Sequence, residues 1–183
     1  GEVRTLSSER GHHARPVFSP DGKTVVFEKR GGGYLVSPLW SSETGIYALA
    51  FDGGPMRRVS KRGSRPQFGA RSDRVYLSEE EESKDADVHR LFSIGIPGLD
   101  PNAAREALDE RVEVESANAT EFALSPDGKY VAFAERFQVH IAALPATGRK
   151  LSVGPKGAAV PTARVSKDAG DHVQFSGDGA RLY

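Results

Sequence analysis

Histidines are the first side chains in this sequence that could carry out chemistry, because a neutral imidazole binds metal ions and transfers protons near neutral pH. The chain has five of them: His12, His13, His89, His140 and His172. None has the H-x-H or H-E-x-x-H spacing of a zinc site, and the adjacent pair at 12 and 13 would point to opposite faces of a strand. We therefore expect no metal-ligating residues in this chain.

Nucleophiles are also poorly represented. The chain has no cysteine, and no serine lies in a G-x-S-x-G elbow. Without a nucleophile paired with a base, we expect no catalytic and no cofactor-binding residues. Lys plus Arg and Asp plus Glu number 25 each, so no net field attracts nucleic acid. No segment reaches the roughly 18 apolar residues of a membrane helix. We expect neither a nucleic-acid partner nor a membrane span.

Four polar side chains share one position in a sequence repeat. They are Arg15, Arg65, Glu121 and His172, and each stands three residues before an apolar anchor: Phe18, Phe68, Leu124 and Phe175. If each begins the innermost strand of a radial fold, the four line a central channel near one mouth as a polar, mainly basic ring. Ordinary solvation of exposed strand ends is the simpler explanation of the same four residues.

The elements that would position these residues are hairpins built on one turn. Ser-Pro-Asp-Gly-Lys occurs at residues 19–23 and again at 125–129. Proline presets φ at the second position of a type I turn, aspartate tolerates the third, and glycine can take the left-handed conformation that follows. Residues 24–27, Thr-Val-Val-Phe, are typical of a strand. Weaker copies of the turn lie at residues 69–73 and 176–179.

The anchors recur at roughly 50 residues, close to the 40–50 of a four-stranded propeller blade. A short strand ending in an apolar residue and then serine, or a near equivalent, precedes each anchor, at residues 4–7, 57–60, 113–116 and 163–166. The sequence predicts an all-β fold, with residues 1–183 as one propeller segment. It comprises about three four-stranded antiparallel blades at 11–60, 64–116 and 120–166, and flanking strands of two more blades at 1–10 and 170–183. A short helix is predicted near 101–110, with Asp100 as its N-cap and Pro101 at its first position.

Complete propellers usually close 4–8 blades into a ring, so this arrangement predicts an open arc. Each open face would leave about four large apolar side chains bare, at a cost of roughly 6–12 kcal/mol. That cost is comparable with the roughly 5–15 kcal/mol stability of a whole domain. We therefore expect the remaining blades to be partners of this chain.

The turns and their flanks resemble a known repeat. Residues 18–27 and 124–133 look like the WD-related repeat of TolB-like β-propellers. Residues 139–148 and 165–179 are similar to the propeller of large TolB-like amidohydrolases. The resemblance implies a non-catalytic segment that scaffolds or gates an attached metal-dependent amidohydrolase-type domain of the same polypeptide, which would hold any metal. The alternative is a TolB-like propeller that binds a protein or peptide and has no attached enzyme. A periplasmic or secreted location is also implied.

Overall fold

The computed structural model describes residues 3–9, 11–31, 43–81, 87–96, 109–154 and 160–183. Every regular element in these ranges is a β-strand, and the strands form three sheets. The predicted all-β class is confirmed. Within the described ranges, no helix has the length and apolar character needed to cross a membrane.

The N-terminal sheet contains four consecutive antiparallel strands. They are β1 (His12–Phe18), β2 (Thr24–Arg30), β3 (Gly45–Ala50) and β4 (Arg57–Ser60), paired in that order. The middle sheet repeats this pattern with β5 (Ser64–Phe68), β6 (Arg74–Glu81), β7 (Val88–Gly95) and β8 (Glu110–Ser116). The C-terminal sheet contains β9 (Ala119–Leu124), β10 (Tyr130–Glu135), β11 (Gln138–Ala143) and β13 (Thr162–Arg164).

The middle sheet has a fifth strand that the sequence analysis did not predict. After β11 the chain crosses back, and β12 (Leu151–Ser152) pairs in parallel with β8. The Val153 N–H then donates to the Glu115 carbonyl at 2.9 Å. Leu151 and Val153 are buried in the cluster between the middle and C-terminal sheets, so this crossing connects the two sheets.

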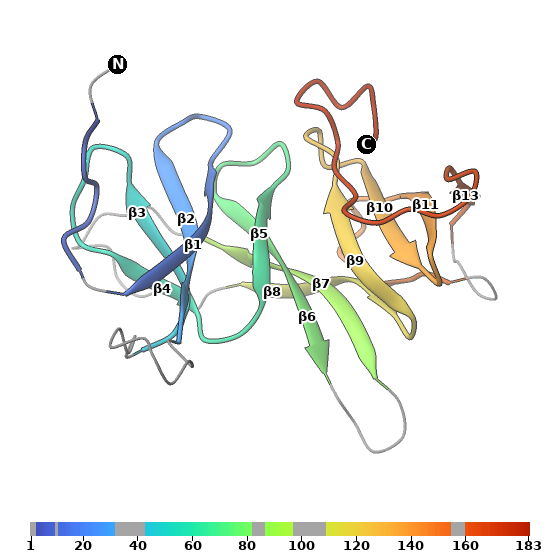
Figure 1. The fold of residues 1–183 in the computed structure, drawn as a ribbon, viewed down its shortest axis with the longest axis horizontal. Coiled ribbons are helices and arrows are strands. Elements are labelled where there is room, and N and C mark those ends of the chain that lie inside the picture. The colour runs from blue at the N-terminus through green and yellow to red at the C-terminus, as the bar shows by residue number, and fades with distance from the viewer. Residues whose placement is uncertain (1–2, 10, 32–42, 82–86, 97–108, 155–159) are drawn as a thin grey trace.

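The three sheets lie side by side in chain order (Figure 1), and β5 contacts both β1 and β9. Both faces of a sheet can be buried because successive residues of a strand point to opposite sides. On β6, Val75 belongs to the cluster shared with the N-terminal sheet. Its neighbour Tyr76 packs against the cluster shared with the C-terminal sheet. Because β5 contacts both β1 and β9, the first strands of the three sheets follow one another along a single side of the molecule.

The outer faces of the two terminal sheets are not bare, contrary to the expectation from an open arc. On the N-terminal sheet, Val25, Phe27, Tyr47 and Leu49 form a buried cluster, and Leu6 and Met56 pack against it. The outer face of the C-terminal sheet consists largely of alanines, which form a cluster with Val139 and Val173. Phe175 and Leu182 pack against that cluster, so local segments already cover much of the apolar surface.

The flanking elements differ from the sequence prediction. Residues 3–9 contain no strand, so the predicted strand at 4–7 is wrong. At the other end, the segment 170–183 contains a single antiparallel bridge, between Phe175 and Leu182. Most of the helix predicted near 101–110 lies outside the described residues, and Glu110, its last residue, is the first residue of β8.

The predicted turns adopt one hydrogen-bond pattern. In the first copy, the Ser19 hydroxyl donates to Asp21 Oδ1 at 2.6 Å and accepts from the Thr24 N–H at 2.9 Å. The same two bonds, with the same lengths, start at Ser125 and at Ser176. The turn glycines have φ of +70°, the left-handed conformation predicted from the sequence: Gly22, Gly128 and Gly179.

We predict that Ser125→Ala lowers the free energy of unfolding by about 1–2 kcal/mol, because it removes one hydrogen bond and leaves the Tyr130 N–H without its hydroxyl partner. The urea midpoint should fall while the m-value stays constant. The matched control is Ser152→Ala at an exposed position of β12, which should leave the midpoint unchanged. Equal midpoints for wild type and Ser125→Ala would show that the turn hydroxyl is dispensable.

Candidate functional site

An open pocket of about 550 Å³ lies beside the first strands of the sheets. Its lining includes all four side chains predicted to form a ring: Arg15, Arg65, Glu121 and His172. They come from β1, β5, β9 and the C-terminal hairpin (residues 172–183), so the fold brings together residues that are far apart in the sequence. We call this pocket the mouth.

Three of the four residues share an unusual backbone conformation. Arg15, Arg65 and His172 have φ of +50°, +51° and +57°, a region that side chains other than glycine and asparagine rarely occupy. The pairing register shifts between Ala14 and Val17 of β1, and at the matching place in β5. Such a bulge redirects a side chain out of the regular alternation. The repeat identified these positions, but not the bulges that orient them.

The charges of the mouth are compensated. Arg15 Nη1 lies 3.1 Å from Glu28 Oε1, and Arg65 Nη1 lies 2.8 Å from Glu121 Oε1. The side chains of Arg15 and Arg65 are 45% and 37% exposed. The arginines therefore reach solvent, and each already has a carboxylate partner. The two carboxylates balance the two guanidinium charges, so the arginines do not give the mouth the basic excess expected from the sequence. His172 is 86% exposed.

Glu28 connects the N-terminal and middle sheets. Its side chain is only 6% exposed, and Oε1 accepts a 2.6 Å hydrogen bond from the Arg65 backbone N–H. Oε2 accepts from Arg30 Nε at 2.6 Å. Burial raises the pKa of Glu28, but the hydrogen bonds from Arg65, Arg30 and Arg15 outweigh burial and leave the pKa below its ordinary value. Sequence reasoning missed Glu28; its one signal was a carboxylate directly after the apolar residues of β2.

Gln67 makes the corresponding connection between the middle and C-terminal sheets. Its Nε2 donates to the Phe122 carbonyl at 2.8 Å, and its Oε1 accepts from the Leu124 N–H at 2.8 Å. The amide therefore bonds the free edge of β9 much as the peptide group of a neighbouring strand would. Sequence reasoning missed this residue too, because its partners are more than fifty positions away.

One group of potential metal ligands lies at the mouth. Glu121, Asp171 and His172 can each place one ligand atom within 4.8 Å of the others. Glu121 Oε2 is buried and has no hydrogen-bond partner. Asp171 and His172 are 75% and 86% exposed, and we assign no ion to the group. The sequence spacing did not indicate it, because Glu121 is distant in the chain from the other two.

No protein-family model matches the chain, and no curated protein matches its sequence. The likeness to TolB-like propellers therefore depends on the repeated turns and their spacing.

We predict that Gln67→Leu lowers the free energy of unfolding by about 1–3 kcal/mol, because it removes two hydrogen bonds and leaves polar backbone groups of β9 without partners. Denaturant unfolding of the 183-residue chain measures the loss. The same substitution at the exposed Gln174 is the matched control and should not change stability. If the two variants lose the same stability, the interaction with β9 is not the cause.

We also predict that Glu28 makes stability dependent on pH. Because its pKa is lower in the folded than in the unfolded chain, its contribution is complete above the ordinary value of 4.5 and is lost as the pH falls through the folded pKa. Glu28→Gln should cost about 1.5–3 kcal/mol at pH 7. The difference from wild type should shrink below pH 4.5. Urea unfolding from pH 7 to pH 3 tests this, with exposed Asp52→Asn as control; a difference independent of pH would contradict it.

Proposed function

We propose that the chain is an arc of a β-propeller in which the three sheets are successive blades and the C-terminal hairpin begins another. The contacts of β5 with β1 and β9 support this arrangement. So do contacts between successive turns. The Asp21 N–H donates to the Ser72 hydroxyl at 3.1 Å, and a Cβ at Gly69 would lie 3.3 Å from the Gly128 Cα. The first strands and the turns thus follow one another in the same order.

Within this arc, we propose a non-catalytic role in recognition and scaffolding. The single observation that carries the proposal is the mouth, where three sheets and the C-terminal hairpin contribute polar side chains to one open pocket. Ligand sites are typically concave and combine apolar walls with a few polar groups that fix orientation. The mouth combines Val17 and Pro66 with the two arginines. It is suited to orienting a substrate for an amidohydrolase-type domain of the same polypeptide.

A second candidate is a propeller that binds a peptide or protein on its own account. The exposed amide of Gln174 in the lining of the mouth favours it, because such a group can bond the backbone of an extended peptide. The two candidates differ in the intact polypeptide: the first requires a hydrolase domain with metal-ligating histidines, and the second does not.

The arginines suggest that the ligand carries a carboxylate. An arginine–carboxylate pair is often bidentate and stronger than a neutral hydrogen bond. Since Arg15 and Arg65 are partly exposed, a ligand carboxylate can approach them from the pocket. Glu28 and Glu121 hold the guanidinium groups in place and reduce their attraction for small ions. We therefore propose selectivity for a peptide with an acidic end over inorganic anions.

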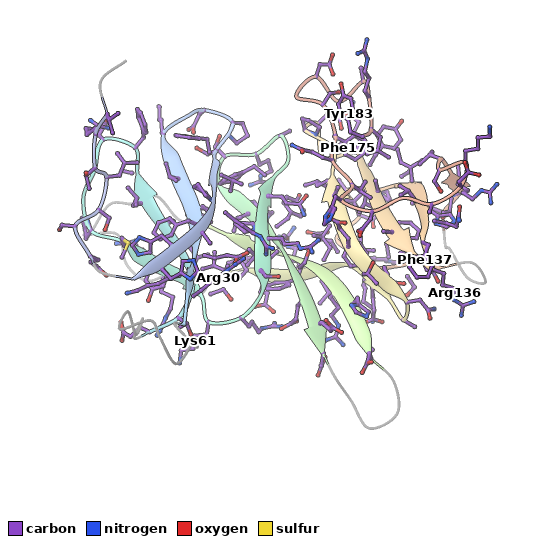
Figure 2. The ribbon with its side chains drawn as sticks, viewed as in Figure 1. Arg30, Lys61, Arg136, Phe137, Phe175 and Tyr183 are labelled. Atoms are coloured by element: carbon purple, nitrogen blue, oxygen red, sulfur yellow. The ribbon has the colours of Figure 1, made fainter. Side chains whose placement is uncertain are left out.

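We predict that N-acetylated pentapeptides with a free C-terminal carboxylate bind the chain more tightly than their amidated counterparts. Arg15→Ala and Arg65→Ala should each weaken binding by about tenfold to a hundredfold, because each removes a hydrogen bond to a charged group. Isothermal titration calorimetry measures binding, and circular dichroism verifies that the variants fold. The control is Arg136→Ala at the exposed turn between β10 and β11, far from the C-terminal hairpin (Figure 2). Equal affinity for free and amidated peptides, or for all three variants, would refute the proposal.

A further inference from the structure

Two side chains of the middle sheet, Gln67 and Tyr76, lie where this sheet meets the sheet that follows. Gln67 of β5 and Tyr76 of β6 are directly opposite one another in the strand register. The Gln67 amide forms its two hydrogen bonds with β9. Tyr76 packs against the apolar cluster between the middle and C-terminal sheets. We call Gln67 and Tyr76 the first Gln–Tyr pair.

The same pair recurs in the C-terminal hairpin. Gln174 and Tyr183 exchange two backbone hydrogen bonds, of 3.1 and 2.8 Å, so they too are directly opposite one another. Gln67 and Gln174 each stand one residue before an anchor, Phe68 or Phe175. We call Gln174 and Tyr183 the second Gln–Tyr pair.

The backbone before the two glutamines is also alike. Arg65 and His172 each lie two residues before the glutamine, and their φ values are +51° and +57°. The C-terminal hairpin therefore repeats the local geometry of β5 and β6 as well as the two side-chain types.

The second Gln–Tyr pair faces away from the C-terminal sheet. Phe175 and Leu182, which alternate with the pair along the two strands, pack against the cluster of that sheet. Successive side chains of a strand point to opposite faces, so Gln174 and Tyr183 are directed to the other side. Tyr183 is 70% exposed, and Figure 2 shows it near Phe175 at the upper right, above Arg136. Among the described residues, the Gln174 amide has no hydrogen-bond partner.

We infer that the second Gln–Tyr pair is a docking surface for the first strand of a further four-stranded sheet of the same repeat. The strand must offer a free carbonyl and a free N–H two residues apart, as Phe122 and Leu124 of β9 do for Gln67. It must also present apolar side chains to Tyr183. This inference rests on the proposed arc of blades, but it does not depend on any ligand in the mouth.

The test uses the 183-residue chain and a synthetic peptide of residues 117–136 with blocked ends. This peptide contains β9 and β10, the segment that the first Gln–Tyr pair contacts within the chain. Titrated into the isotope-labelled chain, it should shift the NMR signals of the Gln174 side-chain amide and of Tyr183. Gln174→Leu should weaken binding by about tenfold, because two hydrogen bonds are lost. Lys167→Leu, at an exposed position, is the control for an added apolar side chain and should bind like wild type.

Three results would overturn the inference: equal affinity of wild type and Gln174→Leu, shifts at Gln67 in place of Gln174, or no shift at the solubility limit of the peptide. The proposed ligand site at the mouth is tested separately, by the binding of the carboxylate peptides to wild type and to the Arg15 and Arg65 variants. A failure of that site can therefore be told apart from a failure of the docking surface. Docking without carboxylate binding would support the surface and refute the ligand. Carboxylate binding without docking would refute the surface alone.

Discussion

The structure depends on how polar backbone groups are satisfied where one sheet meets the next. The first strand of each sheet pairs with a neighbour on one side only, and a buried N–H or carbonyl without a partner is costly. Glu28 and Gln67 supply the missing partners from side chains, to Arg65 and to β9. Each of these hydrogen bonds joins two adjacent sheets that no described strand pairing connects. The sheets can therefore meet at an angle that backbone pairing would not permit, and the mouth forms beside these contacts.

The sheets also need apolar residues on both faces. Adjacent residues of one strand, such as Val75 and Tyr76, enter different clusters, which explains why these strands read as continuous apolar runs without clean alternation. The middle sheet thus packs against two neighbouring sheets at once. At the N-terminal sheet, Leu6 and Met56 pack on the outer face, so the exposed apolar surface is smaller than a bare sheet face would leave.

The sequence predicted features that are local in the chain. The turns at Ser19 and Ser125 depend on contacts within five residues, and the repeat then located the sheets and the four residues of the mouth. Other features depend on distant partners. Glu28 and Gln67 are recognisable only once β5 and β9 are placed, and β12 pairs through just two residues, too few for a periodic signal. The strand predicted at 4–7 was wrong because its edge has no described pairing partner.

The crossing of β12 limits how this repeat can be divided. In a simple array, each unit is contiguous, so a gene segment can be duplicated or exchanged at the joints between units. Here two residues from beyond β11 complete the edge of the preceding sheet, and the nominal joint between β8 and β9 does not separate the two units. A duplication with its boundary at that joint would leave the earlier unit without its last strand. Because of this shared strand, we expect the second and third units to be retained together and to unfold together.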